Sequence, residues 1–345
     1  MNQVVDLRSD TVTQPTKQMR ETMCAAKVGD DVYGEDPTVI ELEEYCAEVL
    51  GKPASLFVPS GTMANQIAIR CHTVPGDTVL AGYKAHTFAY ESGAAAALSG
   101  TQISILPGDG RFTADAVRSV FNDGANAHFP PTRLVTVENT HNMGGGILWP
   151  RAQLAAVLET SRALGMSTHL DGARLWNAAQ AENLAESELT RGFDSVSVCL
   201  SKGLGAPVGS VLAGDVDFIK RAHRFRKMFG GGMRQAGILA AAGIFALKQN
   251  RERLSEDHEN ATYLARELNK VQGLSVKMEN VQTNIVMVDI DKPELDANQL
   301  MERATKRGVR FGAIHSKRFR LVTHLDIDRS ACGNAIQVIT ELSQE

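Results

Sequence analysis

The sequence predicts an α/β protein in which a mainly parallel sheet, covered by helices on both faces, is followed by a smaller α/β domain. Two observations lead to this prediction. Short apolar runs of strand length alternate with helical segments, an order that is typical of parallel sheets. From about residue 251 the sequence pattern changes, and a charged helical segment begins. A chain of 345 residues is long enough for one large and one smaller domain.

The large domain is predicted to contain seven strands, because seven apolar runs have strand length and branched residues. These runs span residues 55–60, 77–82, 103–108, 133–139, 167–173, 195–201 and 209–214. Helices are predicted between most of them, for example at 62–72 and 150–165. The small-residue segment 236–247 indicates a buried helix that packs closely on a neighbour, and it is too short to span a bilayer.

The smaller domain is predicted from a second series of elements. A charged helix is expected over 251–271, and the later elements are strands at 274–278, 284–290 and 320–326, a helix at 297–307 and a final helix. The large domain, with an N-terminal arm, is therefore assigned to residues 1–250 and the small domain to residues 251–345. Ligands of such folds bind beyond the carboxyl ends of the strands.

Composition limits the classes of partner. The formal net charge is −4, from 36 basic and 40 acidic residues without a long run of either sign, so neither nucleic acid nor a membrane surface is expected as a partner. The five cysteines are scattered without a CxxC pair, and the N-terminus is polar, which favours a cytoplasmic protein with reduced thiols. His141, His169 and His324 lack metal-ligand spacing, so no metal is expected.

A single lysine, Lys202, follows the predicted strand at 195–201 and is itself followed by glycines and small residues. A P-loop would place glycines before the lysine and Ser or Thr after it, so the order excludes that motif. A lysine desolvated at a strand end is a usable amine nucleophile, which suggests a Schiff base with an aldehyde. The alternative is a solvated lysine on a glycine-rich loop.

Other polar groups also follow predicted strands. Asp171 lies 31 residues before Lys202, and a buried carboxylate with a strand-end lysine is the pair that pyridoxal phosphate chemistry needs. Ser60, Gly61 and Thr62 lie where a strand turns into a helix, a place suited to binding a phosphate. Taken singly, Asp171 could instead cap a helix, and the turn could be an ordinary strand-to-helix connection.

Blocks of sequence in a fixed order resemble a known family. They are DLRSDTVTQPT, VGDDVYGEDPTV, PSGTMANQ, ENTHN, HLDGARLWNA, CLSKGLGAPVGS, RKMFGGGMRQAGILAAAGI and RLVTHLD. Together they resemble the low-specificity L-threonine aldolases, which have the aspartate aminotransferase-like fold (fold type I), and the resemblance extends from Asp6 to about Asp326. It implies pyridoxal 5'-phosphate as cofactor and reversible retro-aldol cleavage of L-threonine, L-allo-threonine and other L-3-hydroxy-2-amino acids to glycine and an aldehyde.

The resemblance also implies roles for residues around the cofactor. Lys202 would be the Schiff-base lysine, with Ser201 beside it. Asp171 would pair with the pyridine nitrogen, Arg174 would lie beside the ring oxygen, and His86 would stack on the ring. The phosphate would be held by Ser60, Gly61 and Thr62.

Further roles concern the substrate and the assembly. Ser9 and Arg320 would hold the substrate carboxylate, with Arg174 also at the substrate, and His128 would lie near its hydroxyl group. Either His86 or His128, or a water that one of them orients, could take the hydroxyl proton. The resemblance implies an oligomer, a homotetramer built as a dimer of dimers, in which three residues reach a site across an interface: Tyr33, Lys227 and Arg234.

One stretch departs from the pattern of many bacterial relatives. After ENTHN the chain has extra glycines at 144–146 and a tryptophan at Trp149, and we expect this loop to border the site, which leaves the preference between threonine and allo-threonine open. Three other functions remain as alternatives: β-elimination on amino acids, a regulatory module that binds the cofactor without catalysis, and nucleotide binding.

Overall fold

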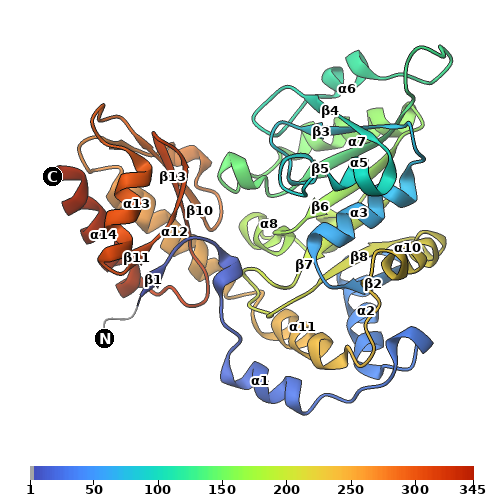
Figure 1. Cartoon of the computed structure of the whole chain (residues 1–345), viewed down its shortest axis with the longest axis horizontal. Helices are drawn as coiled ribbons and strands as arrows, with labels where there is room; N and C mark the ends of the chain where they lie inside the picture. The colour runs from blue at the N-terminus through green and yellow to red at the C-terminus, as the bar shows by residue number, and fades with distance from the viewer. Residues whose placement is uncertain (1–3) are drawn as a thin grey trace.

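The computed structural model describes residues 4–345 and contains a seven-stranded sheet in its larger part (Figure 1). The strand order is β2-β8-β7-β6-β5-β3-β4, and only β8 runs against the others. The strands are β2 Ala54–Val58, β3 Thr78–Gly82, β4 Gln102–Leu106, β5 Thr132–Glu138, β6 Ser167–Gly172, β7 Ser195–Cys199 and β8 Ser210–Gly214. All seven predicted strands are confirmed, as is the mainly parallel sheet.

Alternate side chains of the strands enter two different cores, which shows that helices cover both faces. Leu56 and Val58 of β2 pack with α3 and α10, whereas Phe57 packs in the larger core with α2, α8 and α11. The helices of this part are α1 Lys17–Cys24, α2 Pro37–Val49, α3 Gly61–His72, α4 His86–Ala89, α5 Ala94–Ser99, α6 Ala114–Val120, α7 Arg151–Ala163, α8 Leu175–Glu182, α9 Glu186–Leu189, α10 Val216–Met228 and α11 Gly237–Gln249.

Helix α11 confirms the prediction of a closely packed buried helix. A Cβ atom at Gly243 would lie 2.8 Å from Leu200, and one at Gly237 would lie 2.4 Å from the carboxylate of Asp36. That carboxylate caps α2 by accepting from the N–H groups of Thr38 and Val39, and it also accepts from the N–H of Gly237. Small residues therefore allow α11 to approach α2.

The smaller part has its own antiparallel sheet, in the order β12-β13-β10-β9, and its own apolar core. The elements are α12 Leu254–Leu268, β9 Leu274–Ser275, β10 Ile285–Ile290, α13 Ala297–Lys306, β11 Val309–Arg310, β12 Gly312–His315, β13 Arg318–Val322 and α14 Arg329–Gln344. Two predicted strands are shorter than expected, since 276–278 lies outside β9 and 323–326 lies outside β13. Among residues 4–345, no helix is both long and apolar enough to cross a membrane.

The start of the described chain belongs to the smaller core. Strand β1 (Val5–Asp6) pairs in parallel with β11, and Val5 and Leu7 are buried among residues of α12, α13 and α14. From there the chain passes through a short 3-10 helix, η1 (Asp10–Val12), and crosses to α1, which packs against α11 of the large part (Figure 1). The division at residue 250 remains a prediction, but the first strand packs with the small part rather than as an arm of the large one.

Candidate active site

The carboxyl ends of β2, β3, β5, β6 and β7 bring most of the predicted residues to one edge of the large sheet. Asp171 lies in β6, Lys202 follows β7, and His86 opens α4 after β3. Gly61 begins α3 directly after β2, and Ser60 caps that helix by accepting a hydrogen bond from Met63 N. Strands that run in the same direction present their ends together, so residues far apart in sequence become neighbours.

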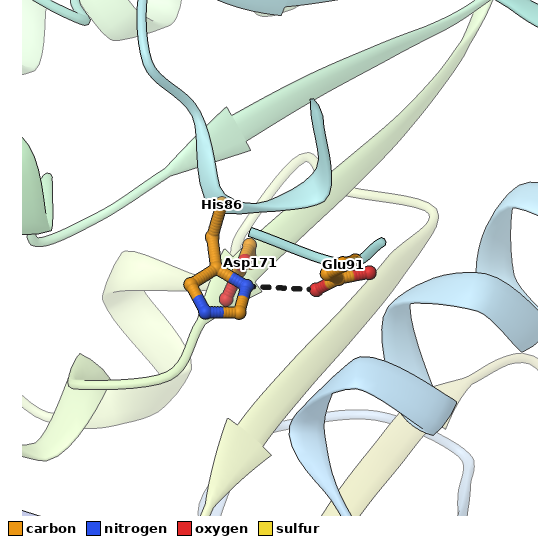
Figure 2. A group of neighbouring side chains, drawn as sticks. All are labelled: His86, Glu91 and Asp171. Atoms are coloured by element: carbon orange, nitrogen blue, oxygen red, sulfur yellow. Dashed lines mark hydrogen bonds and ion pairs between the residues drawn. The ribbon is translucent and has the colours of Figure 1, made fainter. Parts of the chain in front are cut away.

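Figure 2 shows the most compact group at this edge, formed by His86, Glu91 and Asp171, whose polar atoms lie within 4.8 Å of one another. The Nδ1 atom of His86 lies 2.9 Å from Glu91 Oε1. A carboxylate only accepts hydrogen bonds, so Nδ1 carries the proton and Nε2 of the neutral ring keeps a free lone pair. The backbone N–H of His86 donates to Glu138 at the end of β5.

The pKa of His86 lies above its usual value. Burial acts against the charged ring, but the hydrogen bond that His86 donates to Glu91 and the charges of Asp171, Glu91 and Glu138 outweigh it. Sequence reasoning did not find Glu91. The signal was only its position, five residues after His86 in the same loop.

This geometry gives a first prediction. Replacing Glu91 with glutamine should lower the pKa of His86, because the substitution removes a negative charge and a charge-assisted hydrogen bond. The pH dependence of diethyl pyrocarbonate modification at His86, followed by peptide mass spectrometry, measures this pKa directly. The matched change Glu182→Gln, on α8 away from His86, should leave the pH midpoint of modification unchanged. An unchanged midpoint in Glu91→Gln would contradict the contact between His86 and Glu91.

A second group joins the N-terminal segment to the large sheet. The guanidinium of Arg174 donates two hydrogen bonds of 2.7 Å to the carboxylate of Asp10, and both side chains are buried. Burial alone would raise the pKa of Asp10, but the charges of Arg174 and Lys202 lower it to about 2. Burial alone would lower the pKa of Arg174, but the charge of Asp10 and the hydrogen bonds to it raise it. Asp10 was not predicted, although it adjoins Ser9 in the LRSD block.

Arg320 extends this group from the smaller part of the chain. Its Nη1 donates to the side-chain oxygen of Asn142 at 2.9 Å, and its Nη2 donates to the carbonyl of Arg8. Its Nε–H is buried and has no partner within residues 4–345. Burial and the neighbouring Arg174 lower the pKa of Arg320. A half-buried guanidinium with a buried, unused Nε–H is suited to binding a carboxylate. Ser9 lies next to this point as the cap of η1.

The turn from β2 to α3 has the features of a phosphate-binding site. In the first turn of any helix the N–H groups, here those of Gly61 and Thr62, lack intrahelical partners and face positive helix-dipole potential. A Cβ atom at Gly61 would lie 2.8 Å from Cys199 Sγ, so only glycine fits the close approach to β7. Ser201 and Lys202 follow that strand, and Lys202 Nζ forms no hydrogen bond or ion pair with the described part of the chain.

Four predicted residues are not brought to this group in a single chain. His128 is exposed in the loop before β5, at the amino edge of the sheet and therefore opposite the carboxyl ends. Tyr33 is 74% exposed. Arg234 is paired with Asp30, and Lys227 lies in the last turn of α10. The turn that follows α10 packs on Pro59 and Met63 beside the phosphate-binding turn, since a Cβ at Gly231 would overlap Met63.

The glycine-rich loop lies between the two parts of the chain. Asn142 at its start contacts Arg320, but the carbonyl of Gly146 accepts from Thr283, and a Cβ at Gly146 would lie 2.5 Å from the Thr283 hydroxyl. Trp149 is buried, and its indole N–H donates to the carbonyl of Glu138. The loop therefore borders the site through Asn142, while its glycines serve a close contact with the smaller part.

This fold and this arrangement of groups define an enzyme of the aspartate aminotransferase-like class. The sequence model of a family described as beta-eliminating lyase matches residues 6–292. A low-specificity L-threonine aldolase from Escherichia coli K12 is 46% identical over 94% of this chain and 95% of its own length. Low-specificity L-threonine aldolase 1 from Arabidopsis thaliana is 43% identical over 94% of this chain and 92% of its own. The solved structure of a threonine aldolase from Leishmania major covers 97% of this chain and 98% of its own with a TM-score of 0.83 at 20% identity, and so shows the same fold.

The chain therefore belongs to the family of low-specificity L-threonine aldolases, within the beta-eliminating lyases.

Proposed function

We propose that this chain uses pyridoxal 5'-phosphate to cleave L-threonine, L-allo-threonine and related L-3-hydroxy-2-amino acids reversibly into glycine and an aldehyde. The observation that carries the proposal is the meeting of Lys202, Asp171 and the phosphate-binding turn at one sheet edge, with Arg320 entering from the smaller part. The names of relatives that are more than 40% identical over nearly their whole length support it.

The residues present fit this cofactor. Lys202 offers an amine without a competing partner among residues 4–345, and the N-terminus of α3 offers N–H groups without intrahelical partners for a phosphate. Asp171 offers a buried carboxylate for the pyridine nitrogen. When bound, pyridoxal phosphate supplies an aldehyde that captures amines and a ring that accepts the electrons of a breaking bond.

The chain's own groups would then position the amino acid. Among the described residues, the buried Nε–H of Arg320 has no partner. The adjacent hydroxyl of Ser9 adds a second donor, so together they would bind the carboxylate of the substrate. Arg174 adds positive charge nearby, but two of its donors are already used by Asp10. Fixing the carboxylate fixes the orientation of the bond to be cleaved.

Proton transfer from the substrate hydroxyl is assigned to His86. The contact with Glu91 leaves Nε2 of the neutral ring free to accept a proton, which is the property a general base needs. His128 remains a proposed second participant. Because its loop lies at the opposite edge of the sheet, it could reach a reacting hydroxyl only from another copy of the chain.

The experiment that tests the function is a substrate comparison. Purified protein loaded with pyridoxal phosphate is mixed separately with L-threonine, L-allo-threonine and their D forms, and acetaldehyde and glycine are measured. Release from the L forms alone is expected, and the ratio of the two rates gives the preference at the β-carbon. Cofactor binding without any cleavage would move the function to β-elimination or to a non-catalytic role.

Replacing His86 with alanine should slow cleavage by about 10²- to 10⁴-fold without abolishing it, the usual range for losing a general base. Glycine release under saturating substrate measures the effect. The exposed His315 on β12 provides a matched control, because His315→Ala should retain wild-type activity. A His86→Ala variant with unchanged kcat would remove His86 from this role and leave His128 as the candidate.

We further infer a homotetramer with shared sites in a reducing, cytoplasmic environment. The proposal of an assembly is supported by the exposed Tyr33, which suits a contact surface better than solvent. Lys227 and Arg234 lie near the turn that packs beside the phosphate site. All five cysteines are free, as expected of a protein that works with reduced thiols.

A further inference from the structure

A buried amide lies between the two carboxylates of the candidate active site. Asn65, in the second turn of α3, donates one N–H to Asp171 Oδ2 at 2.8 Å and the other to Glu91 Oε1 at 2.9 Å. The amide and both carboxylates are buried. Asn65 therefore contacts at once the carboxylate proposed for the cofactor nitrogen and the carboxylate that orients His86.

Two contacts of the amide oxygen fix the orientation of the Asn65 side chain. Its oxygen accepts from the hydroxyl of Ser197 at 2.7 Å and from His169 Nε2 at 3.1 Å. A flipped amide would place its oxygen against two carboxylates and its NH₂ against two donors, so only one orientation satisfies all four contacts.

The donors behind Asn65 form one continuous chain. His169 Nδ1 lies 2.9 Å from the hydroxyl of Ser195, which in turn lies 2.8 Å from His72 Nε2. Burial lowers the pKa of His169 to about 3 and that of His72 to about 4, so both rings are neutral near pH 7. Since His169 Nε2 donates to Asn65, its Nδ1 accepts from Ser195, and Ser195 accepts from His72. Every proton in the chain points toward Asn65.

The two carboxylates differ in how much they depend on this amide. Glu91 also accepts from Gln66 Nε2 at 2.5 Å and from His86. Asp171 accepts from the backbone N–H of Ala173, and within residues 4–345 Asn65 is its one side-chain donor. The buried carboxylates of Asp171 and Glu91 carry like charges and repel each other. The NH₂ group of Asn65, which both accept from, places partial positive charge between them.

We propose that Asn65 is a positioning residue that sets Asp171 for the cofactor's ring nitrogen and Glu91 for His86 with the two protons of one amide. The inference rests on the proposed pyridoxal phosphate site. Neither role involves contact between Asn65 and a reacting atom. The neighbouring amide of Gln66 reaches Glu91 alone, which makes it a natural comparison.

The test is the variant Asn65→Asp, which keeps the shape of the side chain and the acceptor for Ser197 but replaces the shared donors with an acidic oxygen. The apo protein is titrated with pyridoxal phosphate, and the dissociation constant is measured by absorbance. We expect the affinity to fall by about 10- to 100-fold at pH 8, the range for losing a buried hydrogen bond to a charged group.

A pH series separates this role from simple packing. Between pH 8 and pH 6 the difference in cofactor affinity between Asn65→Asp and wild type should become smaller. The introduced carboxyl takes up a proton over this range and can then donate one hydrogen bond. In the wild type the facing histidines His169 and His72 are neutral over this range, because burial lowers the pKa of each. His86, Glu91 and Asp171 are present in both proteins, and the midpoint of diethyl pyrocarbonate modification at His86 is measured in each, so that the titration of His86 is taken into account.

Gln66→Glu provides the matched control. The same amide-to-acid change at the neighbouring position should move the midpoint of diethyl pyrocarbonate modification at His86, through Glu91, but leave the cofactor affinity within about threefold. Asn65→Asp should change both quantities. Equal cofactor affinity in Asn65→Asp and wild type would overturn the inference, whereas a wild-type protein that binds no pyridoxal phosphate would overturn the proposed function instead.

If Asn65→Asp does not fold, Ser197→Ala carries the test. It removes one of the two donors that fix the amide without touching either carboxylate. A measurable loss of cofactor affinity, together with unchanged far-ultraviolet circular dichroism, is expected, and undiminished affinity would overturn the inference.

Discussion

Replacing Lys202 with alanine will abolish threonine cleavage, with a loss of at least about 10³-fold in kcat. The lysine follows β7 directly, and its amine forms no ion pair or hydrogen bond in the described chain, so it is free to react with an aldehyde. Loss of the side chain removes that amine while leaving the large sheet and the apolar cores on its two faces intact. Glycine and acetaldehyde release from L-threonine measures the effect.

The control for this prediction is Lys220→Ala, which removes an exposed lysine from α10 and should leave the rate unchanged. A second measurement, reduction with borohydride followed by peptide mass spectrometry, should find the cofactor attached at Lys202 in the wild type and at no peptide in Lys202→Ala. Cleavage at the wild-type rate in the variant would overturn both the cofactor and the reaction.

Replacing Asp10 with asparagine will have the largest expected effect on stability. The substitution leaves the buried guanidinium of Arg174 without its negative partner, and breaking a buried ion pair on one side typically costs about 3–5 kcal/mol. Denaturant unfolding of the apo protein measures the change in the free energy of unfolding. Asp109→Asn, which breaks the surface pair with Arg111, should cost less than about 1 kcal/mol. Similar losses in the two variants would contradict the buried pair.

The pair of Asp10 and Arg174 also makes the free energy of unfolding depend on pH. The pKa of Asp10 is about 2 in the folded protein against 3.8 for the unperturbed group, so the folded state binds its proton less readily. Its contribution to stability is complete above pH 4 and is lost as the pH falls toward 2. The acid limb of the unfolding curve should therefore flatten in Asp10→Asn.

Sequence reasoning found the residues that follow strands, and it missed those that act through distant partners. Lys202, Asp171 and Gly61 lie where an apolar run ends, so the fold class alone predicts that they meet. Asp10 and Asn65 offer no such signal. The partner of Asp10 lies 164 residues away and the shared carboxylate of Asn65 lies 106 residues away, distances at which pairing depends on the tertiary fold.

The fold was more fully predictable than the site. Alternation of strand and helix determined the seven-stranded sheet, because each apolar run had to be buried between helices. The pairing of β1 with β11 was not predictable, since a two-residue strand carries no periodicity and its partner lies at the other end of the chain. The position of His128 at the amino edge of the sheet was not predictable, because a sequence match does not show at which edge of the sheet a loop lies.

The N-terminal segment of this protein cannot be treated as a dispensable tail. It forms a separate two-stranded sheet with β11 of the smaller part, and a few residues later Asp10 binds Arg174 of the large part and Asn284 of the small part. The polypeptide thus passes between the two parts twice, near residue 10 and near residue 252. One of these two connections lies beside Arg174, so any movement of the smaller part relative to the larger one would disturb the chain within the candidate active site itself.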